Sequence, residues 1–79
     1  MHIVYILQSQ KDKSYYTGYT TDLENRLKEH DAGEGPYTSS KRPFRLIWHC
    51  VFEDKIKAIH FEKYLKSGSG FAFARKRLV

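Results

Sequence analysis

Residues 3–30 join two short aromatic runs to a helix-forming segment that follows them directly. Residues 2–8 and 15–19 are rich in β-branched and aromatic side chains, and the six polar residues between them suit a hairpin turn. The two runs therefore predict an antiparallel hairpin. Tyr5 and Tyr16 project from one face of it if the strand register brings them close together. The residues alone leave that register open.

A helix is predicted immediately after the hairpin. Residues 21–24 read Thr-Asp-Leu-Glu, a capping box in which the Thr21 side chain caps the helix and Glu24 reaches back. The helix is expected to run to about residue 31 and to stop at Gly33. Because its first turn follows the second strand at once, the positive end of its dipole points toward the hairpin.

The rest of the chain adds a loop, a third strand and two more helices, expected at residues 33–43, 44–52, 55–67 and 70–78. Asp54 is the expected cap of the second helix and Gly68 its stop. The side chains expected to face the core are Trp48, Ala58, Phe61, Leu65, Phe71, Ala74 and Leu78. The order strand, strand, helix, strand, helix, helix predicts a mixed α/β (α+β) class and a single domain over residues 1–79.

Composition narrows the classes of function. The chain has 79 residues, of which 41% are hydrophobic, so it has material for one modest core. The lone Cys50 forms no internal disulfide, and the sequence offers no leader and no long apolar run, which together predict a soluble cytoplasmic protein with no membrane partner. The formal charge is +5, and most of the cations lie in the second half of the chain, which favours a polyanionic partner.

The element order can gather five polar side chains on one side of the fold: Tyr5, Tyr16, Arg26, His30 and Glu62. Arg26 and His30 are four residues apart, so they are neighbours on their helix. Phosphodiester hydrolysis needs a base for water, a divalent metal and a cation for the developing charge. A single carboxylate such as Glu62 is compatible with Mg²⁺, which keeps most of its waters.

Each of these residues also has an ordinary structural interpretation. Tyr5 and Tyr16 can be half-buried strand aromatics, with no chemical role. Arg26 can be a solvated helix residue, and Glu62 can form a helix-surface ion pair with Lys66.

The ordered set of motifs resembles the GIY-YIG nuclease superfamily, specifically its small standalone single-domain bacterial type (UPF0213-like). Ile3-Val4-Tyr5 stands at the first motif and Tyr16-Thr17-Gly18 at the second, followed at matching spacing by Arg26, His30 and Glu62. Further matches are Tyr37-Thr38, Lys41-Arg42-Pro43 and the run at residues 62–70. Each three-residue motif is weak alone, whereas the ordered set covers essentially the whole chain.

The resemblance implies a three-stranded antiparallel sheet flanked by helices and cleavage of DNA that depends on Mg²⁺ or Mn²⁺, in the setting of DNA repair or recombination. It implies that Tyr16 is the general base, or its relay, for the attacking water. Tyr5 would assist proton transfer and positioning, and Arg26 would stabilise the scissile phosphate. Glu62 would hold the metal, and His30 falls where relatives place a His or Tyr near the phosphate.

Two positions depart from the pattern of nucleolytic relatives. Many carry a Lys directly after the Gly of the second motif, where this chain has Tyr19. Relatives often use a late Asn at the substrate phosphate, whereas the only Asn here is Asn25. Lys41, Arg42 and Lys66 are the cations expected to bind nucleic acid in its place.

Three classes of function therefore stay open at this point. The first is a metal-dependent endonuclease whose choice of substrate comes from branched or otherwise structured DNA, or from a protein partner. The second is a nucleic-acid-binding module of the same fold with weak or no catalysis, which the charge and Tyr19 favour. The third is a protein-interaction adaptor.

Overall fold

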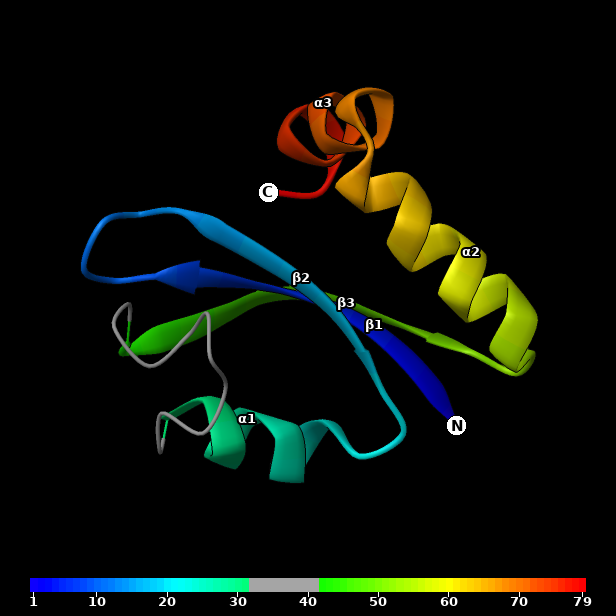
Figure 1. The fold of residues 1–79 in the computed structure, drawn as a ribbon, viewed down its shortest axis with the longest axis horizontal. Coiled ribbons are helices and arrows are strands. Elements are labelled where there is room, and N and C mark those ends of the chain that lie inside the picture. The colour runs from blue at the N-terminus through cyan, green and yellow to red at the C-terminus, as the bar shows by residue number, and fades with distance from the viewer. Residues whose placement is uncertain (32–41) are drawn as a thin grey trace.

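The computed structural model describes residues 1–31 and 42–79. It contains three strands and three helices in the predicted order, shown in Figure 1: β1 (His2–Ser9), β2 (Tyr15–Thr20), α1 (Leu23–Asp31), β3 (Phe44–Phe52), α2 (Lys55–Lys66) and α3 (Gly68–Arg77). The predicted loop at 33–43 and the predicted helix stop at Gly33 lie almost wholly outside the described residues.

The strands form one antiparallel sheet in the order β2-β1-β3, so β1 is central and β2 is an edge. The expected three-stranded antiparallel fold is thereby confirmed. In the hairpin, Tyr5 pairs with Gly18 and Leu7 pairs with Tyr16. Residues opposite each other share a face, and alternate residues of a strand do too. Tyr5 and Tyr16 therefore lie on the same face of the sheet, one diagonal step apart, as the predicted hairpin allowed.

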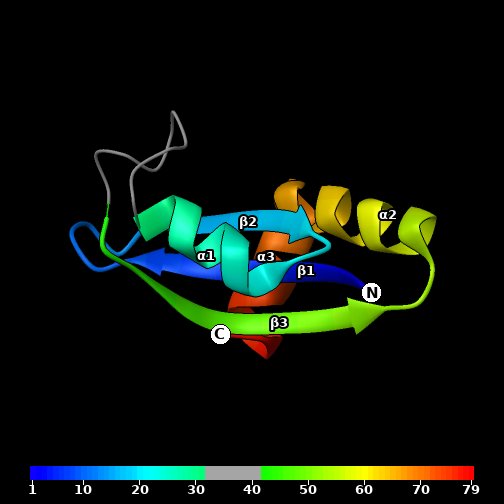
Figure 2. The ribbon, with the colours of Figure 1, turned by 90° about the horizontal axis from the view of Figure 1, so that it is seen from below.

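The two faces of the sheet are covered by different helices. Helix α1 lies on the face that carries Tyr5, whereas α2 and α3 lie on the opposite face (Figures 1 and 2). The main core is on the α2–α3 side and contains the buried residues Val4, Ile6, Ala58, Leu65 and Ala74. The even-numbered residues of β1 thus build the core, and the odd-numbered ones face α1.

Four of the seven expected core residues are less buried than predicted. Phe61 and Leu78 pack against the core but are only partly buried. Trp48 is only partly buried, although it packs against the core with Phe61 at a ring distance of 5.9 Å. Phe71 was expected to face inward, but its side chain is 43% exposed. It lies beside the buried stripe of α3 and contacts the ring of Tyr15 on β2.

The predicted start of α1 is wrong by one residue. The backbone N–H of Asn25 is bound by Oδ1 of Asp22 at 3.1 Å, so Asp22 is the N-cap in place of Thr21. The hydroxyl of Thr20 in turn accepts from the N–H of Asp22 at 3.0 Å. Glu24 does not complete a capping box but approaches Lys28 one turn later, at 3.9 Å.

The predicted cap of α2 is confirmed, since Oδ1 of Asp54 accepts from the N–H of Ile56 at 2.8 Å. The end of this helix differs from the prediction. Ser67 is both the C-cap of α2 and the N-cap of α3, where its hydroxyl accepts from the N–H of Gly70 at 3.2 Å. Gly68 therefore begins α3 instead of only stopping α2. No helix among the described residues is long and apolar enough to cross a membrane.

Candidate active site

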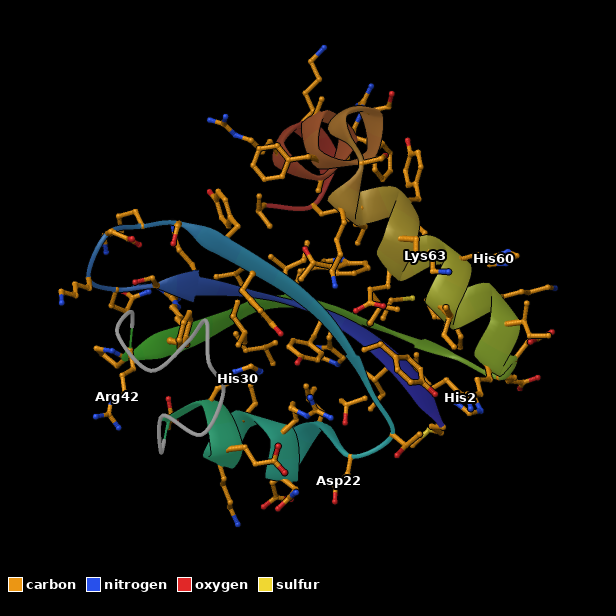
Figure 3. All side chains as sticks on the ribbon, in the orientation of Figure 1. His2, Asp22, His30, Arg42, His60 and Lys63 are labelled. Atoms are coloured by element: carbon orange, nitrogen blue, oxygen red, sulfur yellow. The ribbon has the colours of Figure 1, made fainter. Side chains whose placement is uncertain are left out.

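The centre of the candidate site is a hydrogen bond between β1 and α1. The hydroxyl of Tyr5 lies 3.0 Å from Nε2 of His30, and both side chains are buried. Tyr5 donates in this bond when the imidazole carries its proton on Nδ1. Figure 3 shows His30 projecting from α1 toward the sheet.

The surroundings of Tyr5 keep its hydroxyl protonated. Burial raises the pKa of Tyr5 well above its ordinary value, and the neighbouring Tyr16 adds to that rise. The Arg26 guanidinium acts in the opposite direction, and the Glu62 carboxylate raises the pKa further. Tyr5 is thus a neutral hydrogen-bonding group at any ordinary pH, and the charges of α1 and α2 both act on it.

His30 is held as a neutral imidazole. Burial lowers its pKa, and the positive charge of Arg26 lowers it further, while Glu29 and Asp31 act in the opposite direction. Its ring contacts Tyr16 edge-on, with the centroids 5.1 Å apart. Nδ1 is buried and has no hydrogen-bond partner among residues 1–31 and 42–79. In the tautomer that accepts from Tyr5 at Nε2, Nδ1 carries the ring proton and can only donate; in the other tautomer Nε2 donates to Tyr5 and Nδ1 is free to accept.

Gly18 makes room for the Tyr5 ring. A Cβ atom at this position would overlap the hydroxyl oxygen and Cζ of Tyr5, and would lie 2.9 Å from its Cε1. Only glycine opposite Tyr5 therefore lets the ring lie flat across β2 and reach His30. This explains physically why the second motif needs a glycine two residues after Tyr16.

Arg26 lies at the rim of the cluster. Its Nε is 3.5 Å from a carboxylate oxygen of Glu29, and both side chains are partly exposed. The ion pair is partly solvated, and it occupies one edge of the guanidinium. No other ion pair of Arg26 is found in the described part of the chain, so its terminal nitrogens are available to an anion. Its charge nevertheless acts on both Tyr5 and His30.

Glu62 lies on α2, which covers the face of the sheet opposite to Tyr5 and His30. Its side chain is only 18% exposed, which is low for a helix-surface carboxylate, and its charge acts on the Tyr5 hydroxyl. It also forms the ion pair with Lys66 expected on structural grounds, at 3.2 Å. Glu62 therefore forms the structural ion pair with Lys66 while its charge still acts on Tyr5.

The donor set suits only one kind of metal site. Within the described residues, no group of three or more His, Cys, Asp or Glu side chains is placed to hold a metal ion. Zn²⁺ and other ions that require several protein ligands do not fit such a site. Mg²⁺ or Mn²⁺ fits it, because a hard cation can be bound by one carboxylate, its own waters and a substrate phosphate.

The two expected nucleic-acid-binding cations that the structure describes, Arg42 and Lys66, do not form one cluster. Arg42 is exposed, and its Nη1 donates to the backbone carbonyl of Asp31 at 3.4 Å, near the end of α1. Figure 3 shows Arg42 pointing away from the sheet. Lys66 lies on α2, paired with Glu62. Lys41 lies outside the described residues.

Tyr19, the departure beside the second motif, does not enter the cluster. It pairs with Val4, so it lies on the sheet face opposite to Tyr5 and packs against the main core. Its hydroxyl is 2.8 Å from Nδ1 of His2, and the two rings stack. Tyr19 therefore leaves the cluster of Tyr5 and His30 undisturbed.

Phe44, at the start of β3, is part of the site and was not anticipated. Its ring centroid lies 5.9 Å from that of His30, with the two rings tilted by 58°. The only signal for it was its position as the first residue of the third strand, directly after the Lys41-Arg42-Pro43 motif. An aromatic side chain there helps to bury His30 and so lowers its pKa.

The fold and site define a class of protein: a small three-stranded domain with a buried Tyr–His pair flanked by an arginine and a carboxylate. The GIY-YIG catalytic domain family matches residues 1–76, and the chain belongs to this family. Its membership supports an enzyme of the nuclease class, acting on DNA, in a family that generally depends on a divalent metal.

Within this family, the chain is similar to proteins named UPF0213. The chain is 47% identical over 66 residues to the UPF0213 protein BH0048 of Halalkalibacterium halodurans, covering 82% of this chain and 69% of that protein. It is 45% identical over 67 residues to the UPF0213 protein HQ_3675A of Haloquadratum walsbyi, covering 84% and 74%. The solution NMR structure of UPF0213 protein BH0048 from Bacillus halodurans matches with a TM-score of 0.60 at 38% identity, covering 98% of this chain and 85% of that one.

Proposed function

We propose that this protein is a metal-dependent endonuclease that hydrolyses DNA phosphodiester bonds. The observation that carries the proposal is the buried Tyr5–His30 hydrogen bond: the charge of Arg26 on α1 acts on both of its members, and the charge of Glu62 on α2 acts on Tyr5. A merely structural Tyr–His pair needs neither charge. Family membership supports the same class of reaction.

Tyr16 is the proposed general base, or the relay to it, for the attacking water. It is partly exposed, so water can reach its hydroxyl, whereas Tyr5 is fully buried and cannot meet bulk water. Tyr16 touches His30 edge-on, and His30 is fixed in turn by Tyr5. We assign to Tyr5 and His30 the task of holding Tyr16 in place; as Tyr16 accepts the proton of the attacking water, its own hydroxyl proton passes to the surrounding solvent.

Arg26 is the proposed stabiliser of the scissile phosphate. Its free edge can bind two phosphate oxygens in the fork geometry of guanidinium groups. Lys41, Arg42 and Lys66 are proposed to hold neighbouring phosphates, which positions the strand without reading its sequence. Lys66 can do so only by leaving Glu62.

Glu62 is the proposed protein ligand of the metal. A bound Mg²⁺ or Mn²⁺ would polarise the phosphate and neutralise charge that develops on its oxygens. The carboxylate of Glu62 is mostly buried and paired with Lys66, and its charge acts on the Tyr5 hydroxyl.

A strand-scission assay tests the proposal. Plasmid, flapped, branched and single-stranded DNA are incubated with Mg²⁺ and with the wild type, Tyr16→Phe, Arg26→Ala or Glu62→Ala. We expect each variant to lose at least 100-fold in rate, the order found when one group that stabilises a transition state is removed. The control is Lys28→Gln, which changes an exposed charge of α1 outside the cluster. Equal scission by wild type and all three variants would show that the activity is a contaminant.

A second candidate, a binding module with little catalysis, is favoured by the ion pair between Glu62 and Lys66. In that case Lys66 would permanently neutralise the carboxylate that a metal needs. Salt-sensitive binding of DNA that is unchanged in Glu62→Ala, together with no scission on any substrate, would support this candidate.

A further inference from the structure

The net positive charge of the protein lies on the side of the sheet opposite to the Tyr5–His30 pair. Residues 55–79 contain seven Lys or Arg and one acidic residue, Glu62. Residues 1–54 contain seven Lys or Arg and eight Asp or Glu. The net charge of +5 is therefore due entirely to α2, α3 and the last two residues. All seven of these cations are exposed.

Aromatic rings are exposed on the same surface. Tyr64 of α2 and Phe73 of α3 are 42% and 39% exposed and contact each other, with ring centroids 6.1 Å apart. On the other side of α3, Phe71 contacts Tyr15 of β2 at 6.2 Å. The outer face of α3 therefore lies between two aromatic pairs, Tyr64–Phe73 on one side and Tyr15–Phe71 on the other.

Cations occupy the space between the two aromatic pairs. The guanidinium of Arg75 lies 5.9 Å from the centre of the Phe71 ring, and Lys76 follows it on the outer face. A shallow hollow there is lined by Ala72, Phe73, Arg75 and Lys76. Helix α3 contains no acidic residue to pair with these cations. We call the surface formed by Tyr15, Tyr64, Phe71, Phe73, Arg75 and Lys76 the α3 surface.

We propose that the α3 surface binds single-stranded nucleic acid, with unpaired bases stacked on its aromatic rings and phosphates held by Arg75 and Lys76. Exposed rings alternating with cations are the chemistry of such sites, because every base has a face that can stack. A duplex hides the faces of its bases, so it can use the cations but not the rings. The inference rests on the proposed action on DNA and names the physical form of DNA that the protein holds.

The surface is continuous with the candidate active site around the edge of β2. Tyr15 and Tyr16 are consecutive in this edge strand, so their side chains point to opposite faces of the sheet. Tyr15 contacts Phe71 on the α3 side, and Tyr16 contacts His30 on the α1 side. A flexible single strand that passes over β2 can therefore meet both, whereas a stiff duplex cannot follow so sharp a turn.

Two other occupants suit the surface less well. A second copy of the chain would bring two strongly basic faces together, and their charges would repel. An anionic membrane would attract the cations, but α3 holds Phe73 and Phe71 against other rings instead of presenting a continuous apolar face. Neither explains the continuity with Tyr16.

Binding is measured by fluorescence anisotropy in EDTA, so that no strand is cut. The probes are a labelled oligothymidylate of about 12 nucleotides, a blunt duplex of the same length, and vesicles containing phosphatidylglycerol. We expect wild type to prefer the single strand. The double variant Tyr64→Ala/Phe73→Ala should weaken single-strand binding about tenfold, which corresponds to about 1.4 kcal/mol. The paired variant Tyr64→Phe/Phe73→Tyr keeps both rings and should bind within about twofold of wild type.

The charges are tested separately. Arg75→Gln/Lys76→Gln should reduce the salt dependence of single-strand binding by roughly 0.7 in log–log slope for each cation removed. The matched controls are Ile56→Ala, an exposed apolar residue at the far end of α2, and Lys28→Gln on α1. Both should bind as wild type does. Circular dichroism of every variant confirms that the fold is retained.

The outcomes separate this inference from the proposed function. Loss of scission with unchanged oligothymidylate binding in Glu62→Ala supports both. Binding that depends on the α3 surface in a protein that never cuts DNA supports the inference and removes the proposed function. Scission by a protein whose single-strand binding is unaffected by the aromatic and cationic variants overturns the inference alone. Preference for the duplex, or binding to vesicles without binding to the oligonucleotide, also overturns it.

Discussion

Replacing Gly18 by alanine tests the geometry on which the candidate site depends. The added Cβ would overlap the hydroxyl and Cζ of Tyr5, which is completely buried between β2 and α1. The ring can escape only by rotating away from Gly18, which breaks its hydrogen bond to His30. Gly18→Ala is therefore expected to be destabilising and inactivating together.

The size of the effect follows from two contributions. Forcing an extra methyl group into a packed site typically costs about 1–3 kcal/mol. Loss of the Tyr5 hydrogen bond leaves Nε2 of His30 buried without a partner, at about 1–3 kcal/mol, although the two costs overlap because one movement causes both. We expect a total of about 3 kcal/mol. For a domain of this size that lowers Tm by roughly 12–24 °C.

Gly68→Ala is the matched control. A Cβ at Gly68 meets no atom within 4 Å, and the residue begins α3. Alanine there should change the free energy of unfolding by less than about 0.5 kcal/mol, or should stabilise the helix slightly. Both variants are unfolded in urea and followed by circular dichroism and by tyrosine and tryptophan fluorescence.

A double variant shows whether Tyr5 is the cause. Removing only the Tyr5 hydroxyl is not enough, because the Cβ also overlaps Cζ. In Tyr5→Leu the long ring is absent, so adding Gly18→Ala to it should cost at least 1 kcal/mol less than in the wild-type background. Equal destabilisation by Gly18→Ala and Gly68→Ala, or strict additivity with Tyr5→Leu, would refute the close approach of Tyr5 to Gly18.

Three further perturbations follow from the same structure. The pKa of His30 is lowered in the folded protein, so on acidification the unfolded chain binds this proton first, and the free energy of unfolding falls below about pH 6.5 by at most about 1.4 kcal/mol per pH unit. His30→Phe should remove this part of the pH dependence in urea titrations at several pH values. An unchanged pH dependence would contradict a buried neutral imidazole. Lys66→Gln releases Glu62 from its ion pair and should tighten the binding of Mn²⁺, which is measured as stronger paramagnetic broadening of the NMR signals of amides near Glu62. Lys63→Gln on the same helix should have no such effect. Equal broadening in both variants would show that Lys66 does not compete with the metal. In urea denaturation, Asp22→Ala should lower the free energy of unfolding by about 1 kcal/mol and Thr21→Ala by less than about 0.5 kcal/mol. The reverse order would show that Thr21 is the N-cap after all.

The order of elements could be predicted because it depends on local patterns. Runs of β-branched and aromatic residues mark the strands, and Asp54 marks the start of α2 through its side chain alone. The cap of α1 was misplaced because Thr21 and Asp22 are both good capping residues in succession. Asp22 is the N-cap in the structure, and its own N–H is bound by the hydroxyl of Thr20 at the end of β2. Such a choice depends on how the preceding strand ends, which no local pattern records.

The site was predictable as a set of residues but not as an arrangement. Pairing of Tyr5 with Gly18 is a property of the hairpin turn, in which Ser9 accepts from two N–H groups and Lys13 adopts a left-handed backbone with φ of 65°. A register shifted by one residue would have turned Tyr16 to the core side. The contact of Phe44 with His30 was likewise invisible, because it joins β3 to α1 across more than ten residues of chain.

The exposed position of Phe71 shows how one misplaced residue changes the functional interpretation. A stripe of Phe71, Ala74 and Leu78 has helical spacing, so the pattern predicted three core residues. In the structure Gly70 packs so tightly on the end of α2 that a Cβ would overlap the carbonyl of Tyr64. This contact turns α3 until Gly70 and Ala74 face the core and Phe71 lies at its margin, beside Tyr15.

Successive side chains of β2 point to opposite faces of the sheet, so this strand connects the α1 side of the molecule to the α3 side. Tyr15 faces the basic α3 side and Tyr16 faces the Tyr5–His30 pair, so adjacent residues of one edge strand belong to two different surfaces. A domain this small has no room for a separate binding module within residues 1–79, and the two faces of a single sheet can divide binding from chemistry without one. Because Tyr16 lies on an edge strand and not on central β1, a nucleic-acid strand bound on the α3 surface, as proposed, could reach it around that edge.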